Sequence, residues 1–170
     1  KLITTSSELG INDIVIPCVD QSSLHNEEEV NRFVKQIRSI LPEVERNKIC
    51  LSLETDLPPQ PFMDLISKFD SDRITVNYDT GNSAALGYDP IEELNTYGNL
   101  VTDIHIKDRE LGGGPIFLGR GNVDFDKVFA KLKEIQYKGP FIFQAYRDDE
   151  GVEIFKKQLN WITPYLKNIG

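Results

Sequence analysis

Short apolar runs alternate along the chain with longer amphipathic stretches. The strand-like runs are IVIPC (14–18), ICLSLE (49–54), ITVNYD (74–79), VTDIHIK (101–107) and PFIFQAY (140–146). Their starting points are separated by 35, 25, 27 and 39 residues. Strands and helices that alternate at this spacing predict right-handed βαβ units, and therefore a parallel sheet.

The stretches between the strands carry apolar residues at helical spacing. They predict helices over residues 26–47, 61–69, 89–98, 126–135 and 151–169, with the end of a further helix in residues 1–10. In the first long helix, the expected buried face is Val30, Phe33, Val34, Ile37, Leu41 and Val44. In the last helix, it is Val152, Phe155, Leu159, Ile162 and Leu166.

Polar residues alternate with apolar ones inside four of the strands. Because successive side chains of a strand point to opposite faces, one face of each of these strands is predicted to carry polar groups. The residues on this face are Cys50, Ser52 and Glu54; Thr75, Asn77 and Asp79; Asp103, His105 and Lys107; and Ile142 with Gln144. An open sheet covered by helices would be apolar on both faces. The pattern therefore favours the interior of a (β/α)8 TIM barrel over a doubly wound sheet, for which no G-x-G-x-x-G motif is present.

The composition narrows the choice of partners and compartment. With 19 basic and 27 acidic residues, the net charge is −8, which disfavours nonspecific binding to nucleic acid. No apolar run is long enough to span a membrane. Cys18 and Cys50 lie in apolar stretches without metal-ligand spacing, so we expect two reduced thiols and a cytoplasmic protein.

Four polar residues stand at or near the C-terminal ends of successive strands, where TIM barrels build their active sites. They are Glu54, Asp79, His105 and Gln144. Taken singly, an acidic residue at a strand end is often a helix cap, and His105 between two isoleucines could be a buried structural histidine. Four such residues in phase indicate a site for one divalent metal ion: Mn²⁺, Mg²⁺, Co²⁺ or Zn²⁺.

Four segments resemble a known family. In the order SLET, YDTGN, HIKDR and LGRGNVDF, they are similar to the xylose isomerase-like TIM barrels, the superfamily of sugar phosphate isomerases and epimerases and of AP endonuclease family 2. The resemblance runs from about Ile14 to Tyr165. It implies one metal ion held by a Glu, an Asp, a His and a final Glu. The first three fall on Glu54, Asp79 and His105.

The fourth ligand position falls on Gln144, where most members have Glu. An amide oxygen can bind a metal ion, but it cannot act as a base. The two-base epimerisation that the family implies would then lack one base, with Glu54 as the remaining one. A one-base isomerisation through an enediol is still feasible, as is a dehydration or lyase reaction of a keto-polyol.

Basic and amide side chains near these strand ends are candidates for substrate binding. Lys107 shares the face of His105 and is a candidate catalytic residue that could protonate or hydrogen-bond a substrate oxygen. Asn82 occupies the place of a substrate-contacting His in several relatives. Arg109 and Arg120 follow the fourth of these strands, and Arg147 follows the fifth. Because barrels commonly bind phosphate at their last two loops, Arg147 or Arg120 could hold a phosphate together with glycine N–H groups. The alternative for these arginines is an exposed ion pair with neighbouring Asp or Glu.

Three functions are compatible with these residues. The first is a metal-dependent isomerase or epimerase acting on a sugar or sugar phosphate. The second, an AP endonuclease, fits less well, because that enzyme needs several zinc-binding histidines and this chain has two. The third is a non-catalytic barrel whose Gln144 marks a degenerate metal site.

Five βα units are fewer than the eight that close a barrel. We therefore expect residues 1–170 to be a single domain that supplies about strands 4 to 8 of a TIM barrel. Such a piece would expose unpaired sheet edges, which leaves association into a homo-oligomer open.

Overall fold

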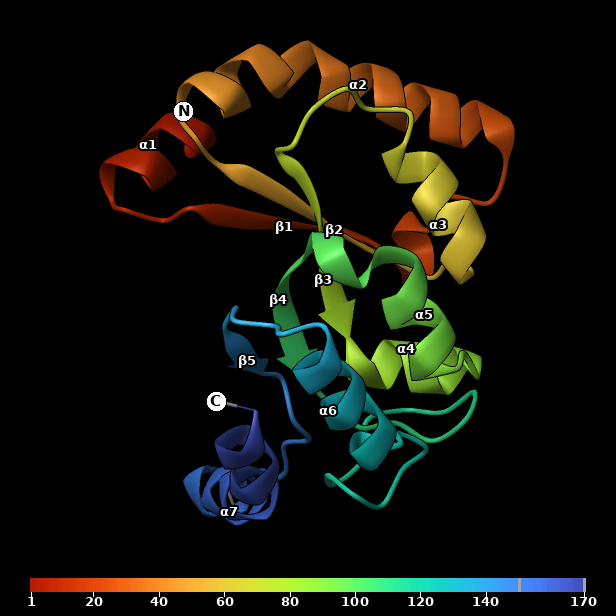
Figure 1. The fold of residues 1–170 in the computed structure, drawn as a ribbon, viewed down its shortest axis with the longest axis vertical. Helices are drawn as coiled ribbons and strands as arrows, with labels where there is room; N and C mark the ends of the chain where they lie inside the picture. Colours follow the sequence, from red (N-terminus) through yellow and green to blue (C-terminus); the bar gives the residue numbers. More distant parts are fainter. Residues whose placement is uncertain (150, 170) are drawn as a thin grey trace. The chain divides into compact units, whose positions relative to one another are not determined.

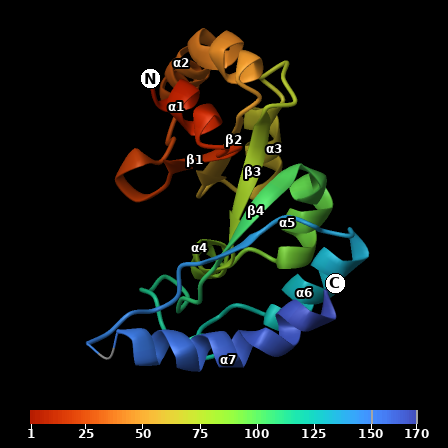
Figure 2. The same ribbon diagram turned by 90° about the vertical axis from the view of Figure 1, so that its left-hand side faces the viewer.

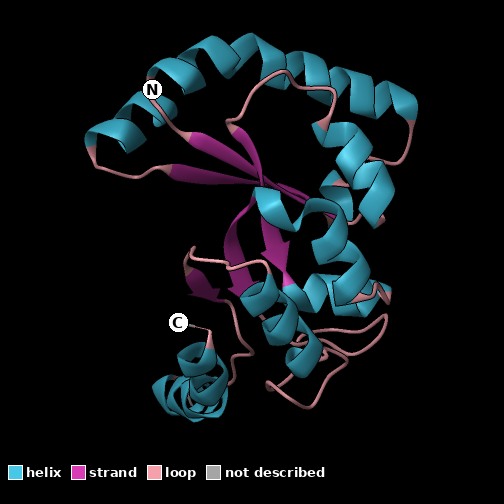
Figure 3. Cartoon of the chain, viewed as in Figure 1, coloured by secondary structure: helices cyan, strands magenta, loops and turns pink. Residues whose placement is uncertain are grey.

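The computed structural model, which describes residues 1–149 and 151–169, follows the predicted alternation of strands and helices (Figures 1 and 3). The strands form one sheet in the order β1-β2-β3-β4-β5, and the pairs β1/β2, β2/β3 and β4/β5 are parallel. Their bounds are Asp13–Cys18, Cys50–Thr55, Ile74–Asp79, Val101–Ile106 and Phe141–Phe143. The chain divides into two compact units, Lys1–Asn77 and Tyr78–Gly170.

The first unit contains the two strands β1 and β2, the start of β3, and the helices around them. Its helices are α1 (Leu2–Glu8), the short 3-10 helix η1 (Asp20–Ser22), α2 (Glu27–Arg46) and α3 (Pro59–Ile66). Helix α2 begins at Asn26, whose side chain accepts a hydrogen bond from the backbone N–H of Glu29 at 3.0 Å. Its predicted apolar face is largely confirmed, because Val34, Ile37, Leu41 and Val44 are buried. Figures 1 and 2 show α2 along one side of β1 and β2.

The second unit contains the end of β3, both β4 and β5, and the remaining helices. Its helices are α4 (Thr80–Leu86), α5 (Pro90–Tyr97), η2 (Gly98–Leu100), α6 (Phe125–Glu134) and α7 (Val152–Asn168). Helix α4 was not predicted, because its seven residues, TGNSAAL, follow β3 directly and have no apolar periodicity of their own. In the described part of the chain, no helix is both long and apolar enough to cross a membrane.

The prediction for the buried face of α7 is confirmed for Ile162 but wrong for Val152, Phe155 and Leu159, which are exposed. Its buried residues are Ile154, Gln158 and Ile162, whereas the exposed fractions of Val152 and Phe155 are 66% and 43%. The three buried positions are spaced by four residues and define one stripe of the helix. Hydrophobic spacing predicted the wrong face for two reasons. The buried face of α7 includes a fully buried glutamine, Gln158, and the apolar residues on the neighbouring face are partly exposed.

The polar faces of β2, β3 and β4 are largely buried, whereas that of β5 is exposed at Ile142 and Gln144. In the first unit, Ser52 and Thr75 are register partners, and their hydroxyl oxygens lie 2.8 Å apart. Ser52 also donates a hydrogen bond to Asp13 at 2.6 Å. In the second unit, Asp103 and His105 are buried on β4, opposite the equally buried Ile104 and Ile106. Polar groups on one face and aliphatic groups on the other fit a barrel wall with a hydrogen-bonded interior.

The loop after β4 is organised by Asp108, which is fully buried. One of its carboxylate oxygens accepts hydrogen bonds from the backbone N–H groups of Gly119 and Gly121, both at 2.9 Å. The other oxygen accepts one from Val123 at 3.1 Å. A buried carboxylate needs such donors, so the loop from β4 to α6 closes around this side chain.

Gly119 combines a left-handed backbone conformation with a close approach to an aromatic ring. Its φ is +80°, and a Cβ at this position would overlap the ring of Trp161 in α7. We expect Gly119→Ala to lower the free energy of unfolding by about 2–4 kcal/mol, because it adds backbone strain and overpacking. Gly114→Ala is the matched control in the same loop, since nothing lies within 4 Å of a Cβ there. Urea unfolding checks the pair, and equal effects would contradict this packing.

Candidate functional site

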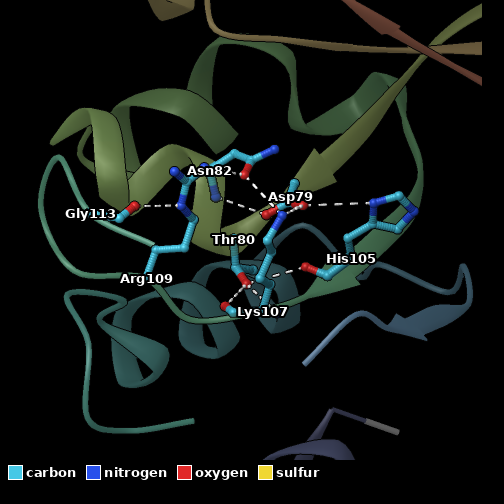
Figure 4. Close-up of polar contacts among 7 residues, drawn as sticks. All are labelled: Asp79, Thr80, Asn82, His105, Lys107, Arg109 and Gly113. Carbon is cyan, nitrogen blue, oxygen red and sulfur yellow. Dashed lines mark hydrogen bonds and ion pairs between the residues drawn. The ribbon is translucent and has the colours of Figure 1, made fainter. Parts of the chain in front are cut away.

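Asp79 ends β3, and its two carboxylate oxygens have different partners (Figure 4). Oδ1 accepts a hydrogen bond from the backbone N–H of Asn82 at 2.8 Å and so caps α4. Oδ2 lies 3.4 Å from Lys107 Nζ and 3.8 Å from His105 Nδ1. The side chain is almost completely buried. Asp79 is therefore a helix cap that keeps one oxygen directed at other polar side chains.

Thr80 fixes the start of α4 against the end of β4. Its hydroxyl lies 2.7 Å from the carbonyl oxygen of Lys107 and 3.2 Å from that of His105, and it accepts a hydrogen bond from the Lys107 N–H at 3.1 Å. The next residue is Gly81, where a Cβ would lie 2.7 Å from Lys107 Cγ. The close contact requires a glycine, and these two residues together hold Asp79 beside His105.

Asn82 brings two positive side chains to one atom. Its Oδ1 accepts hydrogen bonds from Lys107 Nζ at 3.1 Å and from Arg109 Nη1 at 2.9 Å (Figure 4). Arg109 Nε donates to the carbonyl oxygen of Gly113 at 2.9 Å. The structure thus places three of the predicted site residues, Asn82, Lys107 and Arg109, in one hydrogen-bonded cluster with Asp79.

Glu54 belongs to the first unit and lies next to the last residue of β2. It is 7% exposed and shares its strand face with the buried Ser52. Burial raises the pKa of the neighbouring Cys18 thiol to about 11, with smaller contributions from the charges of Asp56 and Glu54. Cys18 is therefore protonated near neutral pH, as expected for a structural thiol.

Gln144 follows β5 and is exposed, while its backbone N–H donates a hydrogen bond to the carbonyl oxygen of Ile106 at 3.0 Å. It shares a strand face with Ile142, the register partner of His105. Both Gln144 and Arg147 line an open pocket of about 930 Å³, together with Lys107, Tyr146, Phe155 and Gln158. The carboxyl end of β5 therefore borders a pocket of the size of small-molecule sites.

Arg120 is placed elsewhere. It is exposed, and its guanidinium group lies over the ring of Phe117, 5.1 Å from the ring centre. It is not among the described residues that line the pocket with Gln144 and Arg147. The structure therefore separates Arg120 from the pocket that Gln144 and Arg147 line.

Two residues that shape this region were not singled out from the sequence, Asp108 and Gln158. Gln158 is fully buried in α7, accepts a hydrogen bond from the backbone N–H of Leu118 at 3.2 Å, and donates one to the carbonyl oxygen of Tyr146 at 2.8 Å. It ties the loop after β4 to the segment after β5. Asp108 could have been found from its position inside the motif HIKDR, before a glycine-rich loop. No sequence pattern indicated the role of Gln158.

The donor set fits a divalent cation. Ligands of one ion at about 2.1 Å lie about 3.0–3.4 Å apart, and Asp79 Oδ2 and His105 Nδ1 need little movement from 3.8 Å to reach this spacing. Carboxylate oxygen and imidazole nitrogen suit Mn²⁺, Zn²⁺ and Co²⁺, and carboxylates suit Mg²⁺. Glu54, Asp79 and His105 each offer one such ligand atom, and all three are buried.

The carboxylate of Glu93 in α5 is buried and connects α5 to β3 and α4 within the second unit. Glu93 accepts hydrogen bonds from Tyr78 at 3.1 Å, from Tyr97 at 2.8 Å, and from Ser83 in α4. Burial raises the pKa of Glu93 above its ordinary value of 4.5, although the three hydroxyl donors partly offset this rise. Burial likewise holds the pKa of both tyrosines well above 10.

The chain matches the family model described as xylose isomerase-like TIM barrel over residues 1–165. Among curated proteins, it is 25% identical to the L-ribulose-5-phosphate 3-epimerase UlaE of Escherichia coli O1:K1 / APEC, over 100% of this chain and 63% of that protein. It is 33% identical to the inosose dehydratase of Geobacillus kaustophilus (strain HTA426), over 49% of this chain and 33% of that protein.

Solved structures share the fold. A xylose isomerase domain protein from Planctomyces limnophilus matches 99% of this chain and 64% of its own, with a TM-score of 0.84 at 21% identity. A xylose isomerase-like TIM barrel protein from Mycobacterium smegmatis, in complex with magnesium, matches 99% of this chain and 65% of its own, with a TM-score of 0.73 at 20% identity. The five strands and their helices are thus part of a TIM barrel, consistent with its C-terminal five units. The chain spans 65% or less of the length of the curated relatives that it matches from end to end.

The raised pKa of Glu93 predicts a pH-dependent stability. Between pH 4.5 and its folded pKa, the folded state retains a proton that the unfolded state has lost, so Glu93's contribution falls as the pH rises through this range. We expect the free energy of unfolding of the wild type to fall relative to that of Glu93→Gln from pH 4.5 upward, as measured by urea unfolding. Glu92→Gln, at the exposed neighbouring position, is the control. A difference that grows in favour of the wild type with rising pH would contradict the assignment.

Proposed function

The chain belongs to the xylose isomerase-like TIM barrel family, and from this premise we propose that it forms the catalytic part of a divalent-metal-dependent isomerase or epimerase. Its substrate would be a sugar or sugar phosphate, in which a proton is moved at a carbon next to a carbonyl group. The single observation that carries the proposal is the buried pair Asp79 and His105, with one carboxylate oxygen directed at the imidazole. We also assign it to the cytoplasm, since its two cysteines form no disulfide.

We assign Glu54, Asp79, His105 and Gln144 as the metal ligands. The alternation of side chains between the two faces of β2 and β3 supports the assignment of Glu54 as a metal ligand. Ser52 and Thr75 are register partners, Glu54 follows the first by two residues and Asp79 follows the second by four. Both carboxylates therefore belong to the polar face of the sheet. Gln144 is the weakest ligand of the four, because its amide oxygen carries no charge.

When bound, a divalent ion at this site supplies Lewis-acid polarisation of the substrate carbonyl group. Glu54 acts as the base that removes the proton from the adjacent carbon and returns it to the former carbonyl carbon, while the hydroxyl proton of the enediol passes between the two neighbouring substrate oxygens. Lys107, whose ammonium group is held at Asn82 and Asp79, donates a hydrogen bond to a substrate oxygen. One base is sufficient for transfer between neighbouring carbons on one face of the substrate.

A dehydratase or lyase acting on a keto-polyol is the second candidate. It is supported by the similarity to the inosose dehydratase, which covers half of the chain. Such a reaction also starts by removing an acidic C–H proton next to a carbonyl, so Glu54 and Lys107 would have the same roles. The two reactions differ in their products, which are an isomeric sugar in one case and an unsaturated ketone and water in the other.

Metal binding is expected to stabilise the chain through Asp79. At 100 times the Kd, Mn²⁺ adds about 2.7 kcal/mol of stability, which raises the Tm of a chain of this size by about 5 °C or more. Asp79→Asn retains a side-chain oxygen that can cap α4 but loses the charge, so it should abolish this rise. The matched control is Asp89→Asn, at the N-cap of α5, which should keep it. Differential scanning fluorimetry with elemental analysis tests this. No bound metal in the wild type, or the same rise in Asp79→Asn, would contradict it.

Gln144→Glu separates an active site from a degenerate one. If the glutamine is part of a working one-base mechanism, the wild type converts a ketose substrate and Gln144→Glu improves kcat/KM by less than about threefold. If the site has decayed, the wild type is inactive and the glutamate variant gains measurable activity. The measurement is the interconversion of ketose isomers followed by chromatography in the presence of Mn²⁺.

A further inference from the structure

The side chain of Asn77 on β3 is buried without a hydrogen bond. Its exposed fraction is 3%, and within residues 1–149 and 151–169 neither its Nδ2 nor its Oδ1 has a hydrogen-bond partner. A buried amide without partners destabilises the folded state, so such groups are rare in native proteins and call for a functional or structural reason. A β-branched aliphatic residue would suit the middle of a buried strand better.

The neighbour of Asn77 on the adjacent strand is Glu54. Ser52 on β2 and Thr75 on β3 are register partners on parallel strands. Two residues further along, Glu54 and Asn77 come next on the same face of these strands, so they face each other across the pair. Both residues belong to the first compact unit, and both are buried.

The two side chains are chemically complementary. An ionised carboxylate only accepts hydrogen bonds, whereas the amide nitrogen of Asn77 offers two donors. The preceding pair on this face shows that facing side chains can reach each other, because the short side chains of Ser52 and Thr75 bring their hydroxyl oxygens to 2.8 Å. Glu54 and Asn77 are longer, so a change of side-chain rotamer is enough to join the amide N–H to the carboxylate.

We infer that Asn77 is a positioning residue for Glu54, whose carboxylate accepts a hydrogen bond from the Asn77 amide in the metal-loaded site. The inference rests on the proposed function, in which Glu54 is both a metal ligand and the base. Hydrogen-bond partners of ligating carboxylates fix the orientation of the ligand, and their loss typically weakens metal binding by about 10–100-fold. A role of this kind explains why the strand retains a buried amide at a cost in stability.

Asn77→Val and Asn77→Thr are the variants that test the hydrogen bond. Their side chains have the same shape and suit a strand, but only threonine has a hydroxyl donor. The measurement is isothermal titration calorimetry of the complete chain with Mn²⁺. We expect the Kd to rise about tenfold or more in Asn77→Val, and by less than about threefold in Asn77→Thr.

Urea unfolding of the metal-free chain separates this role from a purely structural one. Asn77→Val should be at least as stable as the wild type, because it removes a buried amide that has no partner. The matched control is Thr75→Val, on the same strand and face. It removes a hydroxyl that contacts Ser52, so it should lower the stability but change the Kd of Mn²⁺ by less than about twofold.

The inference and the proposed function fail on different results. If the wild type binds Mn²⁺ and Asn77→Val binds it equally well, or if Asn77→Thr binds it as weakly as Asn77→Val, the role of Asn77 is wrong and the proposed function stands. A metal-free Asn77→Val that is less stable than the wild type would also overturn this role. If the wild type does not bind Mn²⁺, the proposed function fails, and the role of Asn77 fails with it.

Discussion

The carboxylate of Asp79 is the group on which the rest of the site depends. Its two oxygens act separately, because Oδ1 caps α4 while Oδ2 lies near the side chains of His105 and Lys107. The arrangement is possible because α4 starts immediately after β3, without a connecting loop. A strand that turns directly into a helix brings the residue at the junction and the residues after it into a fixed geometry.

The residues after Asp79 maintain this geometry by different means. The hydroxyl of Thr80 binds the backbone at the end of β4, and Gly81 leaves room for the Lys107 side chain. Asn82 then presents one oxygen to Lys107 and Arg109. The contacts of these four consecutive residues explain why the segment has the sequence DTGN. In the proposed function, metal binding and substrate orientation are linked, because Asp79 and Asn82 share Lys107 as a partner.

Much of the fold follows from local patterns in the sequence. The predicted strands agree with the structure to within about one residue at most ends, because buried parallel strands are short apolar runs between helices. The last strand is shorter than predicted, at Phe141–Phe143. Helix α4 has no apolar periodicity, and the buried stripe of α7 contains Gln158, so neither could be read from hydrophobic spacing. The similarity to solved structures confirms the predicted TIM barrel fold.

The part of the candidate site that lies on the strands could be predicted, because side chains alternate between the two faces of a strand. Alternation along β3 and β4 was enough to select Asp79 and His105, and the structure brings them together. The role of Asp108 depends on backbone N–H groups of its own loop, and that of Gln158 on backbone groups of two other segments, so neither role follows from a side-chain pattern. The shared contact of Lys107 and Arg109 at Asn82 was likewise invisible, because it depends on the turn from β3 into α4.

The central claim is that His105 binds the divalent ion. Electron spin echo envelope modulation of bound Mn²⁺ tests it directly, because a coordinated imidazole produces nitrogen modulation. The chain has two histidines, which makes His25→Gln a matched control for His105→Gln. We expect nitrogen modulation in the wild type and in His25→Gln, and none in His105→Gln. A wild-type spectrum without nitrogen modulation, or modulation that is lost in His25→Gln instead, would contradict it.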